Sequence, residues 1–131
     1  MNDNFKYSDI TNKIIKAYYN VYNKLGLGFG FLEKVYENAM MIEIKKMGLK
    51  CEKQVPIKVY YDEETIGHYF ADIIVEKVVI IELKADESIC EEHKIQLVNY
   101  LKATDVEVGL LLNFGKKAEF RRKVLTNKYK S

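Results

Sequence analysis

One stretch, residues 69–85 (YFADIIVEKVVIIELKA), constrains the fold of this chain most strongly. Its two runs of branched apolar residues predict two short β-strands that meet in a tight turn at Glu76 and Lys77. An acid inside such an apolar strand costs free energy unless a cation or hydrogen bonds compensate its charge. If the hairpin turns around Lys77, Asp72 pairs directly opposite Glu82, which places two carboxylates roughly 5 Å apart (Cβ to Cβ) on one face.

Two interpretations of this hairpin remain open at this point. Glu82 and Lys84 project to the same side of a strand, so they can form a purely structural ion pair at a sheet edge. Alternatively, Asp72 and Glu82 provide two hard oxygen ligands for a divalent cation, with the ammonium of Lys84 beside them. The stretch by itself favours neither interpretation, because ion-pair networks also perturb such groups.

The length and composition of the chain predict a single soluble domain over residues 1–131. The 131 residues, of which 48% are hydrophobic, are enough for the hydrophobic core of one domain and too few for two domains of ordinary size. The net charge of +2 implies no strong overall attraction to nucleic acid, although seven cations crowd residues 116–130 against Glu119 alone. The two cysteines form no CxxC pair and no apolar run reaches membrane length, so we expect a cytoplasmic protein with free thiols and no membrane contact.

Helical spacing of apolar residues predicts two helices before the strands, over residues 9–25 and from about 32 to 47. Ser8 or Asp9 is expected to cap the first helix, and Gly48 to end the second. The glycine-rich loop between them, residues 25–31, lacks the GK[ST] ending of a phosphate loop and is predicted to be a turn. The expected buried stripe of the second helix comprises Leu32, Val35, Tyr36, Ala39 and Met40, with Glu33 on its flank.

The rest of the chain predicts a mixed sheet with helices against it. Alternating or continuous apolar runs predict strands over residues 54–61, 66–76, 78–85 and 106–114, and residues 118–125 are either an edge strand or a frayed tail. A capping box at residues 88–91 starts a third helix that runs to about Ala103. The element order is therefore α-α-β-β-β-α-β, an α/β (α+β) architecture of about four strands.

The third helix carries a polar line beside its core stripe. His93, Gln96 and Tyr100 fall at i, i+3 and i+7, and Leu97 and Leu101 face the core next to them. Such a line is usually a solvated margin of the helix. It is a candidate for function here because the helix follows directly from the strand that carries the paired acids.

Several of these residues resemble known motifs. Asp72 followed by residues 82–84 (ELK) is similar to the core signature of the PD-(D/E)XK nuclease superfamily, and residues 30–36 (GFLEKVY) are similar to the GxxExxY pattern that names one small family within it. The agreement continues through QVPIKVYY, IIELKA, QLVNYLKAT and GLLLNFG, so it spans nearly the whole chain. It implies a restriction-endonuclease-like core. One departure is Ala71, which stands where the superfamily name has proline.

The resemblance implies roles for four residues of the predicted site. Glu33 corresponds to the helical acid that helps to hold a metal, Asp72 to the central metal-binding aspartate and Glu82 to the second carboxylate. Lys84 corresponds to the lysine that orients or activates the attacking water. The implied cofactor is Mg²⁺ or Mn²⁺, and the implied reaction is metal-dependent hydrolysis of a phosphodiester bond.

The third helix extends this resemblance. Gln96 and Tyr100 are similar to the QxxxY motif of the lambda exonuclease-like branch, which adds both residues to the expected site. The implied function is a DNA nuclease, with DNA a better candidate partner than RNA. The alternative is a non-cleaving protein of the same fold that binds nucleic acid or regulates another protein. The oligomeric state stays open, with a homodimer as one candidate.

Overall fold

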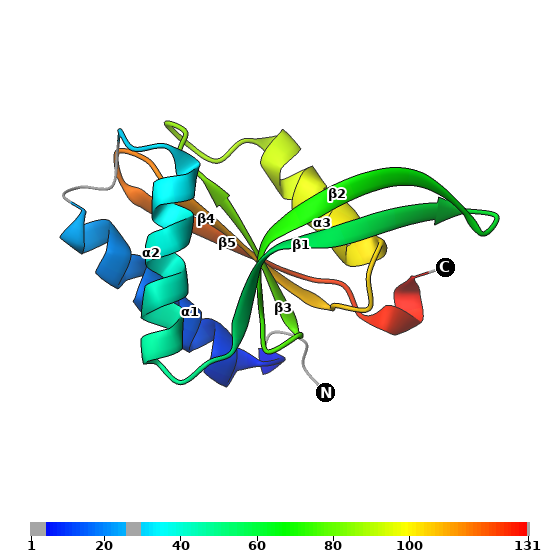
Figure 1. Cartoon of the computed structure of the whole chain (residues 1–131), viewed down its shortest axis with the longest axis horizontal. Coiled ribbons are helices and arrows are strands. Elements are labelled where there is room, and N and C mark those ends of the chain that lie inside the picture. Colours follow the sequence, from blue (N-terminus) through cyan, green and yellow to red (C-terminus); the bar gives the residue numbers. More distant parts are fainter. Residues whose placement is uncertain (1–4, 26–29, 131) are drawn as a thin grey trace.

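The computed structural model describes residues 5–25 and 30–130. Within them, the chain forms helices and strands in the following order (Figure 1): α1 (Ser8–Lys24), α2 (Glu33–Lys46), β1 (Cys51–Tyr61), β2 (Glu64–Val75), β3 (Val79–Lys84), α3 (Glu91–Lys102), β4 (Val108–Phe114), β5 (Ala118–Val124) and a short 3₁₀ turn (Asn127–Tyr129). None of the described helices is both long and apolar enough to span a bilayer.

The strands form one mixed sheet in the order β1-β2-β3-β4-β5. Only β3 and β4 pair in parallel, because α3 connects them, and all other neighbours are antiparallel. The predicted α/β architecture is confirmed, but the sheet has five strands instead of about four. Residues 118–124 are an edge strand that pairs with β4 along its full length. The three consecutive cations at residues 121–123 interrupt the apolar alternation by which a strand is recognised in a sequence.

The sheet separates two hydrophobic layers, with α1 and α2 on one face and α3 on the other. The strand β3 shows this division, because Ile81 and Leu83 pack with α1 and α2 whereas Ile80 packs with α3. Side chains alternate along a strand, so Glu82 and Lys84 also face the side of α3. The predicted hairpin turn is present, since Glu76 and Lys77 both adopt positive φ (50° and 60°) as in a type I′ turn.

The helix α2 differs in part from its predicted amphipathic pattern. Gly48 (φ 80°) ends it as expected, and the buried residues Tyr36, Met40 and Ile44 follow one another at four-residue spacing. The prediction was wrong for Leu32 and Val35, whose side chains are 80% and 39% exposed. The buried line runs through positions 36, 40 and 44, which turns positions 32 and 35 away from the core.

The predicted N-terminal caps of α1 and α3 were wrong. The first helix is preceded by Tyr7 in the left-handed region, without a side-chain cap from Ser8 or Asp9. The third helix is capped by Cys90 and not by Ser88. The backbone N–H of Cys90 donates to His93 Nδ1 at 3.4 Å. Most of the glycine-rich loop, residues 26–29, lies outside the described residues.

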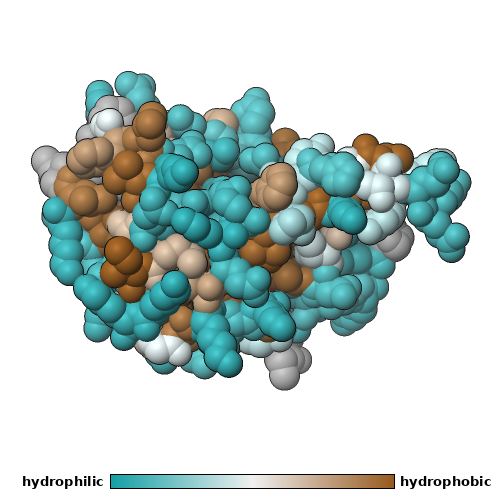
Figure 2. Space-filling model, viewed as in Figure 1, coloured by the Kyte–Doolittle hydropathy of each residue, from teal (hydrophilic) through white to brown (hydrophobic). Residues whose placement is uncertain are grey.

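The strands β1 and β2 form a long two-stranded arm, because β2 pairs with β1 over many more residues than with β3. The strand β2 pairs with β1 along its whole length but with β3 over three residues only, and the last pair of that ladder is Ile73–Ile81. Beyond this pair, β1 and β2 leave the sheet as an arm that projects to the right in Figure 1. Figure 2 shows that the tip of the arm is hydrophilic, in keeping with its turn at Asp62 and Glu63. The sheet therefore forks between β2 and β3.

Candidate active site at the sheet fork

Asp72 occupies the fork. The register of the β2–β3 ladder, continued by one pair, sets Asp72 opposite Glu82 as the sequence predicts. The two backbones separate at this point, and Asp72 Oδ2 instead accepts a hydrogen bond of 2.8 Å from the backbone N–H of Leu83. The carboxylate thus takes the place of the next ladder bond.

Glu82 is the most perturbed acid near the fork. Its residue is 4% exposed, and Oε1 has no hydrogen-bond partner among the described residues. Burial, and then the negative charge of Asp72, raise the pKa of the Glu82 carboxyl to about 10, although the ammonium of Lys84 acts in the opposite direction. Without a cation, this side chain therefore holds a proton at neutral pH.

Lys84 is half-buried on the same face as Glu82, and its backbone pairs in register with Asn113 of β4. No ion pair within 4.0 Å joins Lys84 to any described acid, and β3 is the central strand of the sheet. The structural interpretation, an ion pair between Glu82 and Lys84 at a sheet edge, is therefore wrong.

Glu33 lies in the first turn of α2 and lines a pocket together with Asp72 and Leu83. Its side chain is exposed, yet loss of hydration raises its pKa, while Lys84 lowers the pKa and Asp72 raises it again. These influences place Glu33 in the electrostatic environment of Lys84 and Asp72, although it lies on a different element.

The other residues of the GxxExxY pattern hold the start of α2 in place. Gly30 has a φ of 119°, which disfavours any residue with a Cβ. Tyr36 is fully buried, stacks on Phe114 with ring centroids 4.3 Å apart, and accepts a hydrogen bond of 3.2 Å from the backbone N–H of Phe31. The glycine and the tyrosine thus shape the turn and the packing that position Glu33.

Two further residues border the fork that the sequence analysis did not place in the site. A pocket of about 410 Å³ is lined by Glu33, Lys34, Glu37, Gln54, Asp72 and Leu83. Gln54 Nε2 donates to Glu37 Oε1 at 2.7 Å and to Asp72 Oδ1 at 3.4 Å. Gln54 has a positive φ of 52° inside a strand, an uncommon conformation that often marks a functional site.

The sequence signal for these two residues is unequal. Glu37 follows Glu33 by one helical turn, so its position on the same side of α2 is foreseeable. Gln54 sits at an ordinary polar position of an alternating strand. Nothing in its sequence context indicates the left-handed backbone that aims it at Asp72.

The two carboxylates at the fork, those of Asp72 and Glu82, are suitable ligands for a hard divalent cation. Among residues 5–25 and 30–130, no three His, Cys, Asp or Glu side chains come together as a ready metal site. Mg²⁺, however, is usually held by one or two carboxylates together with waters and substrate phosphate oxygens. A cation held by Asp72 and Glu82 would give Glu82 Oε1 a partner and would favour the ionised form of its carboxyl.

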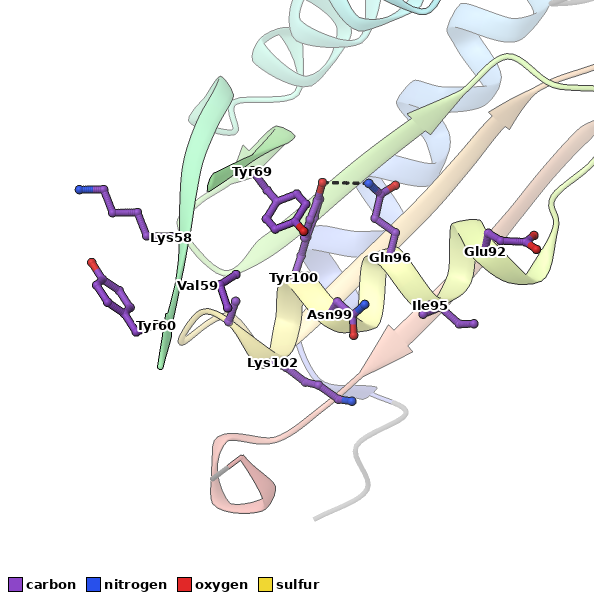
Figure 3. Close-up of a pocket in the computed structure, with 11 residues that line it drawn as sticks. Lys58, Val59, Tyr60, Tyr69, Glu92, Ile95, Gln96, Asn99, Tyr100 and Lys102 are labelled. Carbon is purple, nitrogen blue, oxygen red and sulfur yellow. Dashed lines mark hydrogen bonds between the residues drawn. The ribbon is translucent and has the colours of Figure 1, made fainter. Parts of the chain in front are cut away.

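Gln96 and Tyr100 lie on α3, which covers the face of the sheet opposite to α1 and α2. Gln96 Nε2 lies 3.0 Å from Tyr100 Oη, and Figure 3 shows this contact at the rim of a second, larger pocket. Burial, and then the negative charges of Glu82 and Asp72, raise the pKa of Tyr100 to about 12. Tyr100, which is 6% exposed, therefore lies within electrostatic reach of both acids.

A glycine in β4 lets α3 come this close to the sheet. A Cβ at Gly109 would lie 2.7 Å from Leu97 Cδ1, so any larger residue would push the helix or its leucine away. At the start of α3, His93 Nε2 lies 3.0 Å from Asp86 Oδ2. Asn113 is fully buried and bonds both the N–H and the carbonyl of Asp86, which holds this end of the loop beside the helix.

Comparison with known proteins shows the family and the fold of the chain. A family model described as the PD-(D/E)XK nuclease superfamily matches residues 8–123. A crystal structure of SSO0001 shares the fold with a TM-score of 0.56 at 18% sequence identity. The match covers 72% of this chain and 50% of that one, so the chain spans half the length of SSO0001 as solved. No curated protein sequence matches significantly. Because the family match extends over most of the residues and includes both acids of the fork, the chain belongs to the PD-(D/E)XK nuclease superfamily.

Proposed function

We propose that this protein is a metal-dependent nuclease that hydrolyses phosphodiester bonds of DNA. The observation that carries the proposal is the buried Glu82 carboxyl next to Asp72 in the fork, whose Oε1 has no hydrogen-bond partner among the described residues. Burying a carboxyl beside a second acid without compensation costs free energy, so the position of Glu82 in the central strand next to Asp72 favours a cation as the missing partner. We also propose membership of the GxxExxY family and of the lambda exonuclease-like branch.

In this mechanism, Asp72 and Glu82 would hold the Mg²⁺ or Mn²⁺ ion, and Glu33 would support them from α2. The bound cation would act as a Lewis acid toward water and the phosphodiester. Lys84 projects from β3 on the same face as Glu82 and donates a hydrogen bond to the attacking water or to a phosphate oxygen. Gln54 and the Leu83 N–H keep the Asp72 carboxylate in position.

One observation favours the alternative, a nucleic-acid-binding protein that does not cleave. The net charge of the chain is only +2, whereas a free-standing nuclease often carries a stronger basic face. A cleavage assay distinguishes the two functions. Linear, circular and single-stranded DNA are incubated with the protein and Mg²⁺, Mn²⁺ or EDTA.

The nuclease proposal expects cleavage that depends on the metal and disappears in Glu82→Gln. The matched control is Glu87→Gln, which neutralises an exposed carboxylate in the loop after β3. Loss of cleavage in both variants would indicate damage to the fold instead of the site. Absence of cleavage by the wild-type protein on all three substrates with both metals would leave the binding alternative.

A further inference from the structure

A second pocket lies beside the fork, between the arm and α3. We call it the arm pocket and define it by Val59, Tyr69, Ile95, Gln96, Asn99 and Tyr100, which line its volume of about 710 Å³. This volume is in the range of small-molecule sites. Figure 3 shows Tyr69 directed toward Tyr100, whereas Lys58 and Tyr60 point away from α3 on the other side of β1.

We propose that the arm pocket binds an unpaired base of single-stranded DNA next to the phosphate that is cleaved. The inference rests on the proposed function and narrows it to a class of substrate. It requires a surface for stacking, groups that meet the edge of a base, and a connection to the acids of the fork. The pocket provides all three.

The stacking surface is Tyr69. Its ring is 48% exposed and lies 5.7 Å, centroid to centroid, from the ring of Tyr100, which supports it from within the core. Val59 and Ile95 add apolar side chains on opposite walls of the pocket. An aromatic ring can stack on a base only when the face of the base is free, so this surface favours unpaired over duplex DNA.

The groups for a base edge are the amides of Gln96 and Asn99. These residues are three positions apart on α3 and therefore lie on the same side of the helix. Gln96 Nε2 is engaged with Tyr100, which leaves its carbonyl oxygen for a ligand, and the Asn99 amide is exposed without a hydrogen bond to any described residue. Side-chain amides both donate and accept, as recognition of a base edge requires.

The connection to the acids is Tyr100, because it lines the arm pocket and lies within electrostatic reach of Glu82 and Asp72. A base in the pocket would therefore belong to a nucleotide near the fork. Lys102 also lines the arm pocket and, together with Lys123 of β5, a smaller pocket. Neither lysine has an ion-pair partner within 4.0 Å among the described residues, so both remain available to phosphates of the same strand.

The test is binding of fluorescein-labelled single-stranded DNA and of a blunt duplex of the same sequence, measured by anisotropy in EDTA. We expect the wild-type protein to bind the single strand at least tenfold more tightly. Tyr69→Leu keeps an apolar contact with Tyr100 but removes the ring, and it should weaken single-strand binding by about 5- to 150-fold, the range for one stacked base. Asn99→Ala should weaken it about two- to tenfold.

The matched control is Tyr61→Leu, which removes a ring that is 68% exposed on the same arm but outside the pocket. Its binding should equal that of the wild type. A second readout uses 2-aminopurine in the single strand, whose fluorescence should fall on binding to the wild-type protein and not to Tyr69→Leu. The chain has no tryptophan to interfere with this signal.

The outcomes separate this inference from the nuclease proposal. Unchanged binding by Tyr69→Leu and Asn99→Ala, or a preference for the duplex, would overturn the arm pocket even if the protein cleaves DNA. Conversely, a protein that never cleaves but loses single-strand binding in Tyr69→Leu would retain the arm pocket and reject the nuclease. Thermal melting of each variant excludes a loss of fold as the cause.

Discussion

Asp72 and Leu83 are joined across the sheet fork by a hydrogen bond from a backbone N–H to a carboxylate oxygen, at 2.8 Å. The bond ends the ladder between β2 and β3 and at the same time fixes one of the two proposed metal ligands. A single carboxylate thus has a structural role and a proposed catalytic role. The two roles can be separated by mutation.

Asp72→Asn and Asp72→Ala should differ in stability but not in metal binding. Asparagine keeps an oxygen that accepts from the Leu83 N–H, whereas alanine leaves this buried donor unpaired. We therefore expect Asp72→Ala to be less stable than Asp72→Asn by about 1–3 kcal/mol in urea unfolding. Calorimetric titration with Mn²⁺ should show no binding to either variant. Binding by Asp72→Asn equal to that of the wild type would remove Asp72 from the metal site.

The stability of the metal-free protein should fall as the pH rises. The Glu82 pKa is about 10 in the folded state, against an ordinary value of 4.5, so between these pH values the folded state holds one proton more than the unfolded state. Unfolding then releases a proton, and stability decreases with pH by at most about 1.4 kcal/mol per unit. Thermal melting in EDTA between pH 6 and 9 measures this slope.

Glu82→Gln and added metal should both reduce this pH dependence. Glutamine cannot ionise, and a bound cation favours the ionised carboxylate of the wild type. We expect a flatter profile for Glu82→Gln in EDTA and for the wild type in Mn²⁺. Equal slopes in the wild type and Glu82→Gln would show that Glu82 is not the group responsible.

Lys84→Met should lose cleavage while retaining its fold and its affinity for Mn²⁺. The proposed hydrogen bond from Lys84 is made mainly in the transition state, and loss of one such group typically lowers the rate on the order of 10²–10³-fold. Single-turnover cleavage measures the effect. Lys117→Met, at an exposed position in the turn between β4 and β5, is the control and should cleave normally. An unchanged rate in Lys84→Met would exclude the lysine from the mechanism.

Tyr100→Phe and Gln96→Ala should fold normally but cleave DNA poorly. The Tyr100 hydroxyl meets Gln96 at the rim of the pocket, so removing either polar group should cost under about 1 kcal/mol of stability. If the rim contacts a phosphate or a ligand water, the rate falls in both variants. Tyr129→Phe, whose residue is 70% exposed, is the control. Wild-type activity in the double variant Gln96→Ala/Tyr100→Phe would show that these two residues of α3 do not take part in cleavage.

Gly109→Ala should destabilise the protein although alanine normally suits a strand better than glycine. The added Cβ would lie 2.7 Å from Leu97 Cδ1 in a filled core, and such overpacking typically costs about 1–3 kcal/mol. Adding Leu97→Val should recover part of the loss, because it shortens the side chain that clashes. Strictly additive costs in the double variant would contradict direct contact between these positions.

The sequence by itself determined the types of most elements and the register of the hairpin that carries the acids. Two runs of branched apolar residues around Lys77 predicted the hairpin, and the observed register, in which Val75 pairs with Val79 across a turn of residues 76–78, is the one that continues to Asp72 opposite Glu82. The helical spacing of Gln96 and Tyr100 likewise placed them on one line. These features depend on local backbone geometry, which the order of residue types specifies directly.

The tertiary structure decided what surrounds those residues. The early end of the β2–β3 ladder, the burial of Glu82 and the left-handed backbone of Gln54 depend on contacts between elements distant in the chain. The same holds for β5, which is a strand because β4 offers it a free edge. Likewise, Leu32 is exposed because the buried line of α2 starts at Tyr36, whose ring stacks on Phe114. Packing of this kind outweighs local preference, since the free energy of burial depends on the neighbours and not on the pattern alone.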